Sequence, residues 1–223
     1  MIRVLIVDDH GIIREGIKKL LTDVSGIAVV GEADSGEHAI RLAREEKPDV
    51  VLMDIKMPGI GGLETTRKIL RYEPKTKVIA ISAFDEEPFP SRLIQAGASG
   101  YITKGSGFDE VIKAIQLVAA GDTYLSPVIA QQLAVRSLSS KEDSPFDKLS
   151  ERELQVMLMI TAGQKVQEIS EYLCLSPKTV NSYRYRIFEK LRIRSDVELT
   201  HLALRHGLID KGSLPGDADN QVE

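Results

Sequence analysis

The first 120 residues alternate between short apolar runs and longer segments in which apolar residues recur every three or four positions. Continuous apolar runs separated by amphipathic helices are typical of a parallel sheet that helices cover on both faces. The pattern therefore predicts an α/β domain with five parallel strands. The expected strands are Ile2–Val7, Ala28–Ala33, Val50–Asp54, Val78–Ser82 and Gly100–Ile102.

The hydrophobic pattern changes after this region. Ser126-Pro127 has the form of a helix start and opens a short helix to about Leu138, and a polar stretch without periodicity follows. Ser150 and Glu153 have the spacing of a capping box, after which all apolar spacing is helical. We expect a first domain over residues 1–122, a short helix and linker over 123–148, an all-α domain over 149–210 and a disordered tail over 211–223.

Composition narrows the class of protein. The chain has 223 residues, 43% of them apolar and 28% charged, which suffices for two ordinary cores. The sequence has no apolar run of membrane-spanning length and no secretory signal at its start, so we expect no membrane partner and a cytoplasmic location. Cys174 is the single cysteine, which excludes a disulfide framework, and its apolar surroundings predict a buried side chain.

The net charge of −4 hides a basic stripe. Between Ser176 and Arg194 there are six basic residues and one acidic residue, Glu189. Such a stripe on an acidic chain indicates a polyanionic partner, usually nucleic acid. On charge alone, a solvated helix face is an equally good interpretation.

Three carboxylates lie at the carboxyl ends of predicted strands. Asp8 and Asp9 close the first strand and Asp54 closes the third. In a parallel sheet these two strands are neighbours at the topological switch point, so their ends converge. Three carboxylates at one place require a cation, and an oxygen-rich, incompletely closed site favours Mg²⁺.

A hydroxyl and an ammonium group are expected at the same edge of the sheet. Ser82 ends the fourth strand, Tyr101 lies in the fifth, and Lys104 follows it. This set suits phosphoryl transfer, with Asp54 as nucleophile and with the metal and Lys104 neutralising the oxygens of the transferred group. Each residue alone has an ordinary structural explanation, but their coincidence at the correct strand ends favours a site.

Three segments, Val7–His10, Leu52–Gly59 and Tyr101–Lys104, resemble the signature of bacterial response-regulator receiver domains. The resemblance implies a flavodoxin-like fold that is phosphorylated on Asp54 by a sensor histidine kinase, with Mg²⁺ as cofactor. By the same resemblance, the metal is held by Asp9, Asp54 and the main-chain carbonyl of Lys56, with Asp8 acting through water; Ser82 and Tyr101 are switch residues, and Lys104 contacts the phosphoryl group.

Two features depart from the usual receiver pattern. Gly105 follows Lys104, where many receivers have a cis-proline, which predicts a looser loop. Pro88 and Pro90 stand where the fourth helix would start. Proline is tolerated only in a first turn, so this helix should be short or begin late, near Ser91.

The basic stripe falls on the second of two predicted short helices, which join at residues 174–176. If the apolar positions of that helix are buried, its outward face carries Lys178, Ser182, Tyr185 and Glu189, flanked by Asn181 and Arg186. Polar and cationic side chains on an exposed helix suit base edges and phosphates in a major groove. The alternative is a solvated helix that binds a protein.

Residues 149–199 resemble the helix-turn-helix of the NarL/FixJ (LuxR-type) group, and the segment Ser182–Arg186 is closest to its GacA/UvrY branch. The resemblance implies double-stranded DNA as partner and a homodimer when phosphorylated. It implies base reading by Asn181, Ser182 and Tyr185 and phosphate contacts from Lys178, Arg184 and Lys190. Asn181 stands where a lysine is commoner in this group, a difference that concerns which DNA sequence is preferred rather than DNA binding itself.

The two resemblances together predict a transcription factor switched by phosphorylation, with no enzymatic activity beyond slow phosphorylation and dephosphorylation of itself. An aspartyl phosphatase is one alternative, but the position that should hold its second aspartate is Lys56. A stand-alone architectural DNA-binding protein is another, and it leaves the acidic strand ends unexplained.

Overall fold

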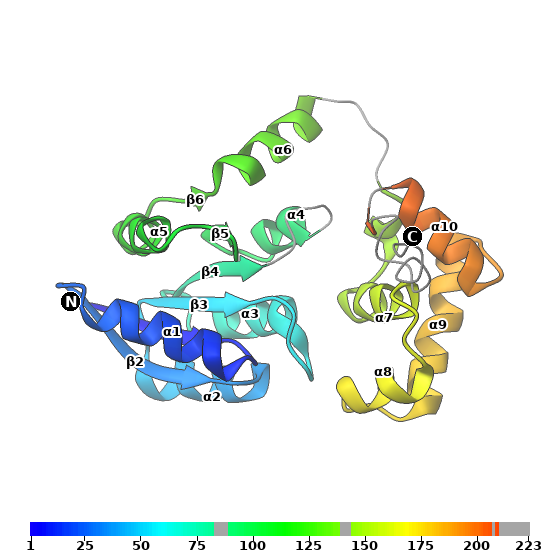
Figure 1. The fold of residues 1–223 in the computed structure, drawn as a ribbon, viewed down its shortest axis with the longest axis horizontal. Coiled ribbons are helices and arrows are strands. Elements are labelled where there is room, and N and C mark those ends of the chain that lie inside the picture. The colour runs from blue at the N-terminus through cyan, green and yellow to red at the C-terminus, as the bar shows by residue number, and fades with distance from the viewer. Residues whose placement is uncertain (83–88, 139–143, 207, 210–223) are drawn as a thin grey trace, which may run out of the picture. The chain divides into compact units, whose positions relative to one another are not determined.

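The computed structural model describes residues 1–82, 89–138, 144–206 and 208–209. The chain divides into two compact units, residues 1–141 and 142–223 (Figure 1). This division falls inside the segment 123–148 that was expected to connect the domains, and the domain limits at 122 and 149 stay predictions. The tail predicted over 211–223 and linker residues 139–143 lie outside the described residues.

The first unit is built on a parallel sheet with the strand order β2-β1-β3-β4-β5-β6. The strands are β1 (Ile2–Val7), β2 (Ile27–Ala33), β3 (Val50–Asp54), β4 (Lys77–Ser82), β5 (Gly100–Thr103) and β6 (Tyr124–Leu125). The first five confirm the predicted strands to within a residue at each end. The predicted count of five was one too low, because β6 has only two residues and shows no periodicity; it pairs with Gly100 and Tyr101 at the sheet edge.

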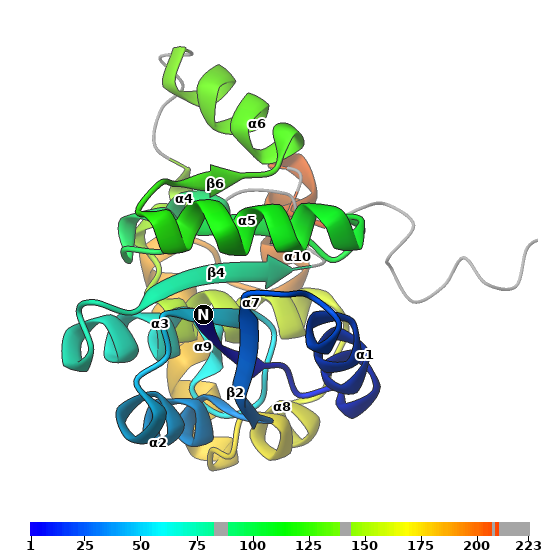
Figure 2. The same cartoon turned by 90° about the vertical axis from the view of Figure 1, so that its left-hand side faces the viewer.

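Helices cover both faces of this sheet (Figure 1, Figure 2). Val4 and Ile6 of β1 face the core shared with α1 and α5, whereas Leu5 and Val7 face the core shared with α2 and α3. The alternation follows from the two-residue period of a strand. The helices of this unit are α1 (Gly11–Thr22), α2 (Gly36–Glu46), α3 (Gly61–Tyr72), α4 (Phe89–Gln95), α5 (Phe108–Ala120) and α6 (Pro127–Leu138).

Helix α4 is short, as its prolines predict. It has seven residues and begins at Phe89, two residues before the expected start at Ser91. Pro90 lies in the first turn, where a missing N–H breaks no helical hydrogen bond. Pro88 lies outside the described residues.

The second unit is entirely helical in its described part. A 3-10 helix (Pro145–Lys148) leads into α7 (Glu151–Thr161), α8 (Val166–Tyr172), α9 (Pro177–Leu191) and α10 (Asp196–Arg205). Ser150 and Glu153 form the predicted capping box at the start of α7. Phe146 is fully buried and anchors the entry to this unit.

The turn between α8 and α9 corrects the prediction for Cys174. Its side chain is exposed, and its backbone is left-handed with φ of 52°. The apolar neighbours that suggested burial belong to the helix faces on either side, whereas Cys174 itself lies where the chain reverses. Among the residues that the structure describes, none of the helices has the length and apolarity that crossing a bilayer requires.

Candidate functional site

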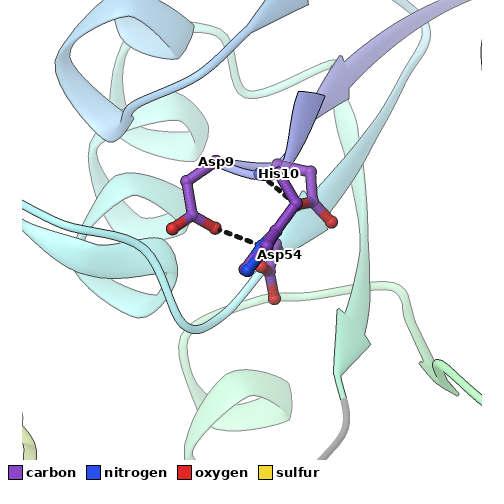
Figure 3. A group of neighbouring side chains, drawn as sticks. Asp9, His10 and Asp54 are labelled. Carbon is purple, nitrogen blue, oxygen red and sulfur yellow. Dashed lines mark hydrogen bonds and ion pairs between the residues drawn. The ribbon is translucent and has the colours of Figure 1, made fainter. Parts of the chain in front are cut away.

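The acidic residues expected at the strand ends do converge. Strands β1 and β3 are neighbours, and Val7 pairs with Met53, so the residues that follow Val7 lie beside Asp54. Asp8, Asp9, His10 and Asp54 each offer a ligand atom, and these atoms lie within 4.8 Å of one another (Figure 3). We call these four residues the acidic pocket.

Lys104 bridges two of the carboxylates. Its Nζ donates hydrogen bonds to Asp8 Oδ2 at 3.0 Å and to Asp54 Oδ2 at 2.9 Å. Its backbone N–H donates to the carbonyl of Ser82 at 2.7 Å, which ties the loop after β5 to the end of β4. The loop therefore brings Lys104 to the pocket although Gly105 takes the place of the usual proline.

Burial makes the pocket unfavourable for negative charge. Asp54 is only 2% exposed, and desolvation, helped by the charge of Asp8 and opposed by Lys104, raises the pKa of its carboxyl to about 6. Burial acts to lower the pKa of Lys104, but its hydrogen bonds to Asp54 and Asp8 outweigh this and raise it. One ammonium group does not balance three carboxylates, so a cation is favoured here.

The donor atoms of the pocket fit Mg²⁺. Asp9 Oδ1 is buried and has no hydrogen-bond partner, as a carboxylate oxygen placed for a metal would be. Asp54 Oδ1 accepts only a long hydrogen bond, 3.2 Å, from the backbone N–H of Lys56, among the bonds described. A partly open set of oxygen ligands at the end of a sheet is what Mg²⁺ requires, because it keeps part of its water shell.

The two expected switch residues are both fully buried. Ser82 ends β4, and its side chain is fully buried. Tyr101 is fully buried in a cluster that includes Leu93 of α4 and Ile129 of α6. Tyr101 thus connects the sheet to α4 and α6.

Sequence reasoning missed Arg14. Its Nη1 donates a 2.7 Å hydrogen bond to the main-chain carbonyl of Asp8, and its Nε lies 3.7 Å from Glu32 Oε2. Arg14 therefore holds the loop between β1 and α1 against β2. The signal available in the sequence was a single arginine one turn into the first helix, which is too common a feature to single out.

The predicted outward face of α9 is exposed. The helix begins with Ser176, whose side chain accepts a hydrogen bond from the N–H of Thr179, and continues with Pro177. Val180 and Ile187 are fully buried beneath it. The opposite side carries exposed Lys178, Ser182, Tyr185 and Glu189, with Tyr185 69% exposed, and Asn181 at its edge is partly buried.

Two of the expected phosphate contacts form ion pairs with carboxylates of their own domain. Arg184 Nε donates to Asp196 Oδ1 at 2.7 Å, and a second nitrogen of its guanidinium contacts the other oxygen of Asp196. Lys190 Nζ lies 2.6 Å from Glu153 Oε2, and Glu153 is 3% exposed. These two ion pairs connect α9 to α10 and to α7.

The ion pair between Lys190 of α9 and Glu153 is electrostatically favourable. Burial acts to raise the pKa of Glu153, but hydrogen bonds from Lys190 and Ser150 outweigh it and hold the pKa below its ordinary value. The carboxylate is therefore ionised at neutral pH and serves both the start of α7 and the position of α9.

Both units match known families. Residues 4–116 match the response regulator receiver domain, and residues 147–203 match the bacterial regulatory proteins of the luxR family. The chain belongs to the response regulators that carry a LuxR-type DNA-binding domain. It is therefore a DNA-binding transcriptional regulator of a two-component system, with DNA and a histidine kinase as its partners.

Relatives of known name place the chain within this family. It is 62% identical over 214 residues to the response regulator GacA of Pseudomonas aeruginosa. The matched region covers 96% of this chain and 100% of that protein. It is 57% identical over 215 residues to the response regulator UvrY of Escherichia coli, with 96% and 99% covered. These relatives confirm the predicted GacA/UvrY branch.

Solved structures support the fold. A LuxR-family response regulator from Aurantimonas shares 40% identity with a TM-score of 0.60, over 62% of this chain and 99% of that one. The response regulator RcsB, in a complex with DNA, shares 25% identity with a TM-score of 0.57, over 90% and 96% of the two chains.

Proposed function

We propose that Asp54 accepts a phosphoryl group from the phosphohistidine of the kinase and that this switches DNA binding by α9. The observation that supports it is the position of Asp54, which is buried at a strand end, close to two other carboxylates and in contact with Lys104. The carboxylate oxygen attacks phosphorus, the P–N bond breaks, and the imidazole keeps the electron pair and takes up a proton. Lys104 then moves its hydrogen bond from Asp54 Oδ2 to an oxygen of the phosphoryl group.

The metal belongs to the same proposal. Asp9, Asp54 and the main-chain carbonyl of Lys56 would hold Mg²⁺, with Asp8 acting through water. When bound, Mg²⁺ neutralises the charge of the transferred phosphoryl oxygens. Lys56 supplies no general acid at the position where a phosphatase needs one, so the chain's own turnover is limited to slow phosphorylation and dephosphorylation of Asp54.

The response would pass through the buried switch residues. The hydroxyl of Ser82 donates to the phosphoryl group once Asp54 carries it, and Tyr101 repacks against α4 and α6. We propose that the resulting surface forms a homodimer, which sets two α9 helices on DNA. Because DNA and the kinase's phosphohistidine are its partners, the protein acts in the cytoplasm.

Within α9 we divide the expected DNA contacts into two groups. Lys178, Asn181, Ser182 and Tyr185 face outward or lie at the edge of that face, and we assign them to phosphate and base contacts. Arg184 and Lys190 are held by Asp196 and Glu153, so we assign them chiefly to positioning the helix.

Phosphorylation by a small phosphodonor tests the central assignment. Full-length protein incubated with acetyl phosphate and Mg²⁺ should gain one acid-labile phosphoryl group on Asp54, located by mass spectrometry. Asp54→Ala should abolish the label, and Asp34→Ala, which removes an exposed carboxylate, should leave it unchanged. Lys104→Ala should still be labelled but should not change its DNA affinity in response. Stoichiometric label on Asp54→Ala would overturn the assignment.

A further inference from the structure

We propose that His10 adds an imidazole ligand to the acidic pocket, so that the pocket binds borderline transition ions such as Ni²⁺ or Zn²⁺ more tightly than Mg²⁺. The inference extends the proposed magnesium site, since it uses the same carboxylates. It assigns to His10 a role that the carboxylates alone do not supply.

The ring of His10 lies among the carboxylates. Its Nδ1 is 2.9 Å from Asp9 Oδ1 and 3.2 Å from Asp8 Oδ1 (Figure 3). Asp9 Oδ1 is nonetheless a buried atom without a hydrogen-bond partner, so its approach to Nδ1 is a close contact rather than a hydrogen bond. The ring nitrogen of His10 and the carboxylate oxygen of Asp9 lie close enough to bind one cation together.

The backbone fixes this position. The N–H of His10 donates a 2.8 Å hydrogen bond to Asp8 Oδ1, which folds the residue back over the pocket. His10 is also the residue that precedes α1, but its side chain makes no capping hydrogen bond to that helix. The ring instead shares a 3.2 Å hydrogen bond between Nδ1 and Asp8 Oδ1, which a cation bound to Nδ1 would replace. With 62% of the side chain exposed, the ring is open to an ion from solvent.

The chemistry of the ligand atoms determines which ion the pocket binds more tightly. Three carboxylates alone form an oxygen site that suits Mg²⁺. Imidazole adds little for that hard cation but is a preferred ligand for nickel, copper and zinc, whose affinities for mixed nitrogen and oxygen sites exceed those of the earlier divalent metals. An ion of this class would occupy the carboxylates that magnesium needs, so it would compete with magnesium for the pocket.

His38 provides a matched control. Its Nδ1 lies 3.2 Å from Asp34 Oδ1, so it resembles His10 in contacting a carboxylate. Within the described ranges, however, the acidic pocket is where three or more ligating side chains converge, and His38 does not belong to it. Replacement of His38 removes an imidazole next to one carboxylate without changing the pocket.

Binding of Ni²⁺ and of Mg²⁺ to untagged full-length protein, each measured by titration calorimetry, tests the proposal. Wild-type protein should bind Ni²⁺ more tightly than Mg²⁺, and excess Mg²⁺ should displace it. His10→Gln should weaken Ni²⁺ by at least about tenfold and change Mg²⁺ by less than about twofold. His38→Gln should change neither. Cu²⁺ bound to wild-type protein should show nitrogen coupling in its EPR spectrum, and His10→Gln should lose it.

Asp9→Asn separates this proposal from the magnesium site itself. It should weaken both ions, because both use that carboxylate. If Asp9→Asn leaves Mg²⁺ binding unchanged, the proposed magnesium site is wrong. If Asp9→Asn weakens both ions but His10→Gln leaves Ni²⁺ affinity and the copper spectrum unchanged, the role of His10 alone is overturned.

Discussion

Burial of the Asp54 carboxylate lowers the stability of the folded protein. Its carboxyl has a pKa of about 6 in the fold, against 3.8 for an unperturbed group. A carboxyl whose pKa is raised binds its proton more tightly in the folded state, so stability falls as pH rises through the interval between the two values. Above that interval the difference corresponds to about 3 kcal/mol of destabilisation, and below pH 3.8 it disappears.

Asp54→Asn should therefore stabilise the receiver domain at neutral pH. The amide has the same shape, can still accept a hydrogen bond from Lys104, and carries no charge to desolvate. In metal-free buffer at pH 7.5, unfolding monitored by calorimetry should show a gain of roughly 1–3 kcal/mol that shrinks toward pH 4. Asp34→Asn removes a carboxylate that is 65% exposed and has a lowered pKa, so it should give no gain.

A gain at pH 7.5 that is equally large at pH 4 would contradict the electrostatic origin and indicate a packing effect instead. The functional residue is therefore not the optimal one for the stability of the fold. The burial that raises the pKa of Asp54 is the burial that keeps water away from its reacting oxygen.

At the scale of elements, the sequence predicted strands and helices well where they form long apolar patterns. The first five strands have continuous apolar runs, and the Ser150 capping box and the Ser126-Pro127 helix start can be recognised locally. Strand β6 escaped prediction because two residues show no period.

Side-chain partners far along the chain were not predictable. Arg184 and Lys190 look like free cations on a basic helix, but their partners stand 12 and 37 residues away on other helices. Convergence of Asp8, Asp9 and Asp54 was predictable over a similar distance only because parallel sheets bring strand ends together as a rule. No comparable rule connects helices of a small bundle.

The two groups of cations on α9 should differ in how DNA binding depends on salt. The logarithm of the DNA-binding constant falls linearly with the logarithm of the salt concentration. Each phosphate contact that is lost makes this dependence shallower by about 0.9. Lys178→Ala should show this reduction on cognate and random DNA alike. Arg184→Ala should leave the slope unchanged, since Asp196 already neutralises that side chain. Equal reductions for both variants, measured by fluorescence anisotropy, would restore Arg184 to the phosphate contacts.

The Lys190–Glu153 pair should support the second unit in a pH-dependent way. Because the pKa of Glu153 is lowered in the fold, its contribution is present above the ordinary carboxyl pKa of 4.5 and is lost as pH falls below that value. Lys190→Met leaves a buried carboxylate without its cation and should destabilise this unit by about 1–3 kcal/mol at pH 7.

Urea unfolding of the Lys190→Met protein at pH 7 and at pH 3.5 checks this. The loss should be smaller at the lower pH, because protonation of Glu153 below its ordinary pKa of 4.5 removes the charge that Lys190 compensates. Arg192→Met, at the exposed end of the same helix, is the matched control and should have little effect at either pH. A loss that does not depend on pH would mean that Lys190 acts through the packing of its aliphatic stem.

At the scale of the whole molecule, each unit has a core of its own. The first is centred on the two faces of the sheet, and the second on residues such as Phe146, Leu154 and Ile187. The helices of the second unit pack on one another, α7 against α8, α9 and α10, which predicts that a fragment beginning at Ser144 folds and binds DNA. Residues 1–122 carry 16 basic and 19 acidic residues, a net charge of −3, whereas the α9 segment is basic.

That difference in charge predicts how phosphorylation changes the affinity for DNA. An acidic receiver tethered to α9 by the chain competes with DNA for the basic stripe, so unphosphorylated full-length protein should bind DNA more weakly than the fragment at equal salt. Phosphorylation biases the receiver toward a dimerising conformation, which releases α9 and presents two copies to half-sites about 34–36 Å apart or at a related spacing.

Side-by-side titrations on one operator in one buffer test this prediction. The fragment from Ser144 should bind without any phosphodonor, and full-length protein should reach comparable or tighter binding only after phosphorylation. Full-length Asp54→Ala treated with phosphodonor is the control and should keep the weaker affinity. Raising salt should narrow the gap between fragment and unphosphorylated full-length protein, because the competition is electrostatic. If the fragment binds no better at any salt concentration, the receiver does not occlude α9, and activation must act through dimerisation alone.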